Sequence, residues 1–135
     1  MKKETSEIGK LRQSKDLKVL IVEDDITSEM MLEIMIEDYC KKPLVALNGV
    51  EAIEICKENP DIDFVLMDIK MPELNGYEAT KIIRQFNKNI LIFAQTAFAL
   101  PGDREKAIEA GCNDYISKPY SQAELKGLIE KYIKH

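Results

Sequence analysis

Four short apolar runs in this sequence are each followed by side chains that suit metal and phosphate chemistry. In chain order, these side chains are Glu23, Asp24 and Asp25 after the first run, Asp68 after the second, Thr96 after the third and Lys118 after the fourth. If the runs are parallel strands, the four groups gather at the carboxyl edge of one sheet, where open α/β sheets bind ligands. Carboxylates, a hydroxyl and an amine meeting there predict a site for a divalent metal ion and a phosphoryl group.

Each residue type has its own use in such a site. Clustered carboxylates favour Mg²⁺, which retains several waters and accepts phosphate oxygens as further ligands. A carboxylate held against a metal ion can also attack phosphorus as a nucleophile. Lys118 would balance the phosphoryl charge, and the Thr96 hydroxyl would donate a hydrogen bond to the group. Each motif alone is weak, but their joint placement after four strands favours function over a set of solvated loops.

Composition restricts the classes of function. The chain has 135 residues, enough for one domain with its own core, and a formal net charge of −5. Because no basic stripe stands out, we expect no direct binding of nucleic acid. No apolar stretch is long enough to cross a bilayer, so we expect no membrane contact. Three cysteines without metal-ligand spacing indicate reduced thiols in a cytoplasmic protein.

Five strands are predicted from short apolar runs that are bounded by turn residues and too short for helices. They cover residues 17–22, 43–47, 62–67, 90–94 and 113–117. Residues 1–15 are polar and are predicted to form a flexible lead-in, with the folded domain spanning 16–135. Helical spacing between and after the strands gives five βα units, which predict a doubly wound α/β fold with a parallel sheet covered on both faces.

The helices are predicted from apolar positions three to four residues apart and from capping residues. The first helix should present one face made of Met30, Met31, Ile34, Met35 and Tyr39. A second runs from Asn48-Gly49 to about Asn59, and a third begins near Gly76 and buries Ala79, Ile82, Ile83 and Phe86. The fourth lies between Asp103 and Gly111, and Ser121 with Glu124 forms a capping box for the fifth. The fifth helix has an apolar face of Leu125, Leu128, Ile129, Tyr132 and Ile133.

With these motifs in place, the sequence resembles the receiver domains of response regulators in two-component signalling. The matching stretches are VLIVEDD, LMDIKMPELNGYEAT, AQTAFA and NDYISKP, and the likeness extends from about Leu17 to Ile133. The resemblance implies a flavodoxin-like fold with five strands in the order 2-1-3-4-5. It also implies a phosphorelay function in which Mg²⁺ is the cofactor.

The resemblance assigns a role to each site residue. Asp68 matches the phosphoacceptor, Asp24 a direct ligand of Mg²⁺, Glu23 a ligand through water and Lys70 a ligand through its backbone carbonyl. Thr96 matches the switch hydroxyl, Tyr115 the switch aromatic residue, Ala97 the residue whose N–H faces the phosphoryl group, and Lys118 the phosphoryl-binding lysine. The Lys118–Pro119 peptide bond would be cis. Asp25 falls outside the motif and is expected to be solvated or to lie at a helix terminus.

The resemblance also implies partners and an output surface. A histidine kinase or a histidine phosphotransfer protein would supply the phosphoryl group, and the fourth helix, fifth strand and fifth helix would form the surface that switches. We expect a homodimer, where one forms, to use the same surface. The domain would perform only its own phosphorylation and slow dephosphorylation, and would not be an enzyme for other substrates. The motifs are most similar to receivers of hybrid sensor histidine kinases, and the alternative is a stand-alone regulator.

Three other classes of protein fit the motifs less well. A haloacid-dehalogenase type phosphatase needs a second aspartate two residues after the nucleophile, where this chain has Lys70. A flavodoxin-like electron carrier needs hydroxyls and glycines after the first strand, where this chain has acids. A receiver that signals without phosphate would normally lack the acceptor, an acid or the lysine. All three are present here.

Overall fold

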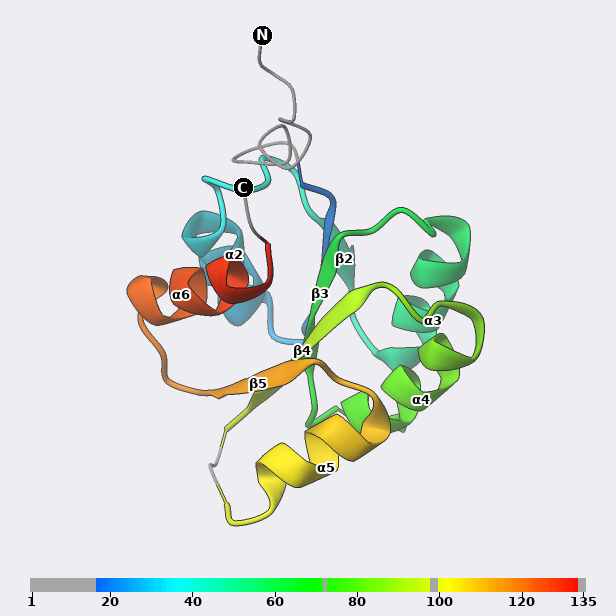
Figure 1. Cartoon of the computed structure of the whole chain (residues 1–135). Helices are drawn as coiled ribbons and strands as arrows, with labels where there is room; N and C mark the ends of the chain where they lie inside the picture. Colours follow the sequence, from blue (N-terminus) through cyan, green and yellow to red (C-terminus); the bar gives the residue numbers. More distant parts are fainter. Residues whose placement is uncertain (1–16, 72, 98–99, 134–135) are drawn as a thin grey trace, which may run out of the picture.

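A single parallel sheet forms the centre of the protein, which is described here from a computed structural model over residues 17–71, 73–97 and 100–133. Its strands are β1 (Val19–Val22), β2 (Leu44–Ala46), β3 (Phe64–Asp68), β4 (Leu91–Thr96) and β5 (Asp114–Ser117). Their spatial order is β2-β1-β3-β4-β5 (Figure 1), which confirms the predicted flavodoxin-like fold of the receiver type. The predicted lead-in at residues 1–15 lies outside the described residues.

The sheet is buried on both faces, which explains the uninterrupted apolar runs in its central strands. Every residue of β1 and of β3 is buried. The pairing register aligns Val22 with Met67 and Asp68 with Gln95, and the last residue of β4, Thr96, with Ser117. Four strands carry site residues at or just after their carboxyl ends, namely β1, β3, β4 and β5, and these ends therefore lie at one edge of the sheet.

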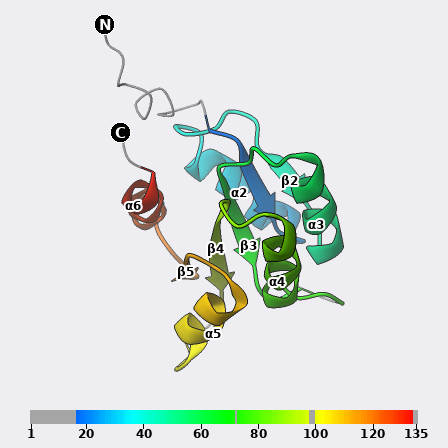
Figure 2. The same ribbon diagram turned by 45° about the vertical axis from the view of Figure 1, so that its right-hand side comes forward.

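Helices cover both faces of the sheet, as Figures 1 and 2 show. One layer consists of α2 (Ile26–Met35) and α6 (Gln122–Tyr132), and the other of α3 (Gly49–Glu58), α4 (Gly76–Phe86) and α5 (Asp103–Ala110). The side chains of Asn48, Asn75 and Ser121 cap the starts of α3, α4 and α6. These caps fix the points at which the chain turns from the sheet edge into each helix.

The predicted apolar face of the first helix is wrong. Met30, Met31 and Ile34 are 54–63% exposed. The residues that face the sheet from α2 are instead Glu29 and Leu32. Tyr39 is buried as expected, but it lies beyond the end of α2. The helix has two apolar faces with the same spacing, and the one packed on the sheet continues through Ile36.

Phe86 is a second correction. It ends α4 and is 40% exposed rather than buried, with the Lys57 ammonium 5.7 Å from the centre of its ring. Ile82, also predicted to be buried, is half-buried. The strand ends shift by one or two residues, and two of these shifts matter for the site. β3 and β4 extend through Asp68 and Thr96, so the sheet itself holds these two residues. In the described residues, no helix is long and apolar enough to cross a membrane.

Candidate functional site

Three carboxylates gather at the carboxyl edge of the sheet. Glu23 and Asp24 follow β1 directly, and Asp68 is the last residue of the neighbouring strand β3. One oxygen from each lies within 4.8 Å of the other two. Glu23 and Asp68 are 2% and 6% exposed, whereas Asp24 is exposed to solvent. This group of hard oxygen donors, open on one side, suits a small divalent cation that retains water ligands.

Lys118, which directly follows the edge strand β5, places its ammonium group beside these carboxylates. Its Nζ donates a hydrogen bond to Glu23 Oε1 at 3.2 Å and lies 4.0 Å from Asp68 Oδ1. The Lys118–Pro119 peptide bond is cis. The backbone N–H of Lys118 donates to the Thr96 carbonyl at 2.7 Å, so the turn that carries the lysine is fixed to the end of β4.

The surroundings of Asp68 disfavour its ionised form. Burial raises its pKa to about 6, and the charges of Glu23 and Asp24 act in the same direction. The Lys118 ammonium and the hydrogen bond from the Lys70 backbone N–H, 3.3 Å from Asp68 Oδ1, oppose that rise in pKa. A metal ion bound by the cluster would favour the ionised carboxylate, which is the nucleophilic form.

The predicted switch residues lie next to this cluster. Thr96 is half-buried at the end of β4, and Ala97, the following residue, is exposed. Tyr115 lies on β5 and packs against the part of the core between the sheet and the layer of α3, α4 and α5. The aromatic ring therefore lies on the face of the sheet that α5 covers, and β4 separates its strand from β3, which carries Asp68.

The third acid of the first motif has a separate role. The Asp25 side chain accepts a hydrogen bond from the Ser28 N–H at 2.8 Å and caps α2. This hydrogen bond is the main reason for the lowered pKa of Asp25. It is a helix-terminus charge, as expected, and is not part of the carboxylate cluster among the described residues.

The segment after Asp68 folds closely over the end of β3. Lys70 is exposed, and Glu73 has a φ of 68°. A Cβ atom added to Gly76 would lie 2.4 Å from the carbonyl oxygen of Asp68, so this close approach requires glycine. The sequence indicated Gly76 only as the start of a helix, and its contact with the backbone of Asp68 was not predicted.

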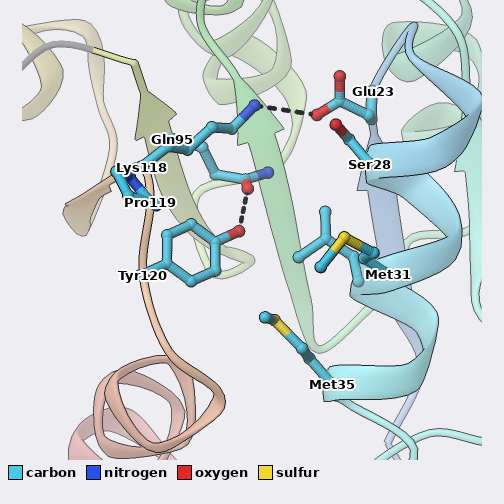
Figure 3. Close-up of a pocket in the computed structure, with 9 residues that line it drawn as sticks. Glu23, Ser28, Met31, Met35, Gln95, Lys118, Pro119 and Tyr120 are labelled. Carbon is cyan, nitrogen blue, oxygen red and sulfur yellow. Dashed lines mark hydrogen bonds and ion pairs between the residues drawn. The ribbon is translucent and has the colours of Figure 1, made fainter.

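The sequence also gave no role to Gln95 and Tyr120. Gln95 is completely buried in β4, and its Oε1 accepts a hydrogen bond from the Tyr120 hydroxyl (Figure 3). The only sign in the sequence was a polar residue that interrupts the apolar run of the fourth strand. A cavity of about 220 Å³ separates these two residues from α2, and Met31, Met35 and Leu32 line its opposite wall.

Comparison with known sequences gives a consistent result. The family model of the response regulator receiver domain matches residues 19–130. Hybrid signal transduction histidine kinase G of Dictyostelium discoideum is 40% identical over 131 residues, which are 91% of this chain and 4% of that protein. The polar-differentiation response regulator DivK of Brucella anthropi is 36% identical over 117 residues, which are 85% of this chain and 94% of DivK.

Solved structures agree with this comparison. A chain in the co-crystal structure of the Saccharomyces cerevisiae histidine phosphotransfer signalling protein Ypd1 and the receiver domain of Ssk1 superposes with a TM-score of 0.81 and 33% identity, over 90% of each chain. The receiver domain of the Pseudomonas aeruginosa sensor histidine kinase PA1611 superposes with a TM-score of 0.77 and 35% identity, over 87% of this chain and 97% of that one. The latter structure has a magnesium ion coordinated in its active-site cleft.

Proposed function

The chain belongs to the response regulator receiver domain family of two-component signalling, and from this membership we propose that it accepts a phosphoryl group from a phosphorylated histidine onto Asp68. The observation that carries the proposal is the convergence of Glu23, Asp24 and Asp68, with Lys118 beside them, at one edge of the sheet. Neither an electron carrier nor a structural module needs this combination of groups.

The carboxylates of Glu23, Asp24 and Asp68 would hold Mg²⁺, assisted by the backbone carbonyl of Lys70. We assign Asp24 as a direct ligand because it is exposed, and Glu23 as a ligand through water because its carboxylate already accepts from Lys118. When bound, the ion would neutralise negative charge where the phosphoryl oxygens approach. The magnesium ion in the active-site cleft of the PA1611 receiver supports Mg²⁺ as the ion, and the assignment of each ligand is our proposal.

In the transfer step, a carboxylate oxygen of Asp68 attacks phosphorus, and the bond between phosphorus and the histidine nitrogen of the donor breaks. The phosphoryl group is now an acyl phosphate, and the electron pair of the broken bond remains on the imidazole. Lys118 stabilises the charge on the transferred oxygens, and the Thr96 hydroxyl and Ala97 N–H donate hydrogen bonds to them. The domain acts on its own side chain, and we propose no other substrate.

The solvent face of α2 is the surface on which we place the phosphodonor. Ile26, Met30 and Ile34 follow one another at helical spacing and are 58–70% exposed, with Met31 beside them. This helix begins immediately after the acidic residues, so a partner that covers the row reaches the site edge. An exposed apolar row of this kind suits an amphipathic helix. The complex of Ypd1 with the Ssk1 receiver supports a histidine phosphotransfer protein as the class of partner.

The surface that changes on phosphorylation would lie on the β5 side of the site, away from α2. We propose that Thr96 moves toward the phosphoryl group and that the Tyr115 ring then turns inward, which changes the surface of α5, β5 and α6. In this surface Asp114 is already paired with Arg104 of α5 and with Lys131 of α6. A homodimer through this surface would bury the Ile108 side chain of α5, which is 45% exposed.

The domain could belong to a hybrid sensor histidine kinase or act as a stand-alone regulator, and we propose the hybrid kinase. The identity to a hybrid histidine kinase supports a receiver that forms part of a larger sensor protein. The alternative is a stand-alone regulator, which the coverage of DivK along nearly its whole length favours. Immunoblotting of the source cells decides between them: a band near 15.4 kDa means a stand-alone protein, and a much larger band means a hybrid kinase.

The buried free thiols of Cys40, Cys56 and Cys112 support a reducing compartment such as the cytoplasm.

A small phosphodonor tests the central step without a protein partner. With acetyl phosphate and Mg²⁺, the intact mass should increase by one phosphoryl group, and a chelator should abolish the increase. Asp68→Asn should prevent the reaction, whereas Asp25→Asn is the matched control and should react as wild type, because the Asp25 side chain caps α2 and lies outside the carboxylate cluster of the described residues. Equal modification of wild type and Asp68→Asn would overturn the proposal.

A further inference from the structure

Gln95 is a buried polar residue in a position that packing alone would give to an apolar one. It is 0% exposed, yet its side chain has one hydrogen bond among the described residues, from the Tyr120 hydroxyl to Oε1. Its Nε2 has no partner in the described part of the chain. Burying an amide with half of its groups unpaired costs free energy, so retention of the amide needs an explanation beyond stability.

Gln95 and Tyr120 join two segments that both carry phosphoryl-binding residues. Gln95 immediately precedes Thr96, and Tyr120 follows Lys118 by two residues, after the cis proline. The hydrogen bond lies on the α2 and α6 side of the sheet, where Figure 3 shows the Tyr120 hydroxyl directed at the Gln95 amide. It is separate from the backbone bond between Lys118 and Thr96.

The turn from Lys118 to Tyr120 borders a cavity on its α2 side. The cavity of about 220 Å³ lies between this turn and the methionine side chains of α2. Tyr120 packs partly against the core on this side of the sheet, and hydrogen bonds add direction to that packing. Besides the Tyr120 bond and the backbone bond, Gln122 Nε2 at the start of α6 donates to the Met35 carbonyl at the end of α2, at 3.1 Å.

We propose that Tyr120 and Gln95 are positioning residues for phosphoryl binding, and that they act through Lys118. Their hydrogen bond fixes the turn on the sheet, which keeps the Lys118 ammonium 3.2 Å from Glu23 and 4.0 Å from Asp68. Neither residue touches the phosphoryl group. Without the bond, the ammonium group would have more freedom, and the charge that it offers to the phosphoryl oxygens would be less well placed.

The test measures binding of beryllofluoride, a phosphoryl mimic, at saturating Mg²⁺. Tyr120→Phe removes only the hydroxyl, and we expect it to weaken beryllofluoride binding about three- to tenfold, the range for one net hydrogen bond, without weakening Mg²⁺ binding. Gln95→Met should give the same loss, and the double variant should be no weaker. Tyr39→Phe is the matched control, because it removes a hydroxyl that donates to Glu130 at 2.7 Å and lies away from Lys118.

The Lys118→Ala background separates positioning from a general loss of stability. If Tyr120 acts through Lys118, adding Tyr120→Phe to Lys118→Ala causes no further loss of beryllofluoride affinity. A further loss of the same size, or wild-type affinity in both Tyr120→Phe and Gln95→Met, overturns the inference. The inference rests on the proposed function, and the two fail differently: if Asp68→Asn binds beryllofluoride as well as wild type, the proposed function itself is wrong.

Discussion

The Lys118 ammonium lies 3.2 Å from the Glu23 carboxylate and 4.0 Å from that of Asp68, so one cation serves two of the three acids in the site. In the proposed function, the lysine would therefore compete with a metal ion for the same negative charge before it assists phosphoryl transfer. Metal binding and transfer should respond in opposite directions when this charge is removed.

Lys118→Ala should bind Mg²⁺ more tightly than wild type, because a nearby positive charge is lost. It should nevertheless accept phosphate at least about tenfold more slowly, because the transferred oxygens lose their cation. Calorimetric titration with Mg²⁺ and the rate of modification by acetyl phosphate measure the two effects. Weaker Mg²⁺ binding in this variant would mean that the lysine organises the cluster and does not compete with the metal.

Asp24→Asn should lower Mg²⁺ affinity more than Glu23→Gln does, by about tenfold or more for the direct ligand. Asp24 is exposed and contributes repulsion to the cluster, so Asp24→Asn should also raise the free energy of unfolding without metal. Glu23→Gln should not, because it removes an ion pair with Lys118. Mg²⁺ titration and urea unfolding test both points, with Asp25→Asn as the control. Equal losses of affinity would contradict the direct-ligand assignment.

A charged substitution on the solvent face of α2 should affect transfer from a protein phosphodonor but not transfer from a small-molecule one. Met30→Glu should slow transfer from a phosphorylated histidine phosphotransfer protein by about tenfold or more, since it places a charge in an apolar interface. The rate with acetyl phosphate should not change. Phe86→Glu, another exposed apolar position at the far end of α4, is the control and should leave both rates at the wild-type level. Equal effects of the two substitutions would remove α2 as the docking helix.

Acid should weaken the connection between α5, β5 and α6 through Asp114. Burial alone would raise the pKa of Asp114, but hydrogen bonds from the Tyr115 N–H, Tyr132, Arg104 and Lys131 lower it to about 2. A carboxyl group with a lowered pKa stabilises the fold above its unfolded pKa, and that contribution is lost as the pH falls through the folded value. Asp114→Asn should therefore cost about 2 kcal/mol at pH 7. The difference should shrink between pH 4 and pH 2.

Urea unfolding followed by circular dichroism measures this difference, and comparison of the two proteins cancels the groups that they share. The exposed pair of Asp61 with Lys18 provides the control, and Asp61→Asn should have almost no effect at either pH. A difference between wild type and Asp114→Asn that stays constant from pH 7 to pH 2 would show that the charge of Asp114 is not the source of the stability.

The sheet and the carboxylate cluster could be predicted from the sequence because both follow from strand ends. Strands that are buried on both faces appear as uninterrupted apolar runs, and parallel strands place the residues after those runs at one edge. Asp68 and Thr96 are found where this reasoning puts them. The pattern could not show that the strands extend through these residues, because strand ends depend on pairing with neighbours.

The buried face of α2 could not be predicted, because two sets of apolar residues have helical spacing. Leu32 with Ile36 and Met30 with Ile34 are each four residues apart, and only tertiary packing selects the first pair. The burial of Glu29 made the correct choice look unfavourable. Burial and the neighbouring Glu33 raise its pKa to about 7, which lowers the cost of placing this carboxyl group against the core. The Gln95–Tyr120 bond was equally inaccessible, since it joins residues that are 25 positions apart.

The proposal that Asp68 is the phosphoacceptor is tested most directly by identifying the modified carboxylate. Borohydride reduces the acyl phosphate of an aspartate to homoserine, which tandem mass spectrometry locates in the chain after treatment with acetyl phosphate and Mg²⁺. We predict homoserine at position 68 and at no other carboxylate of the cluster. Reduction at Asp24 or at another acid, or acid-labile phosphate that persists in Asp68→Asn, would contradict the assignment of Asp68 as the phosphoacceptor.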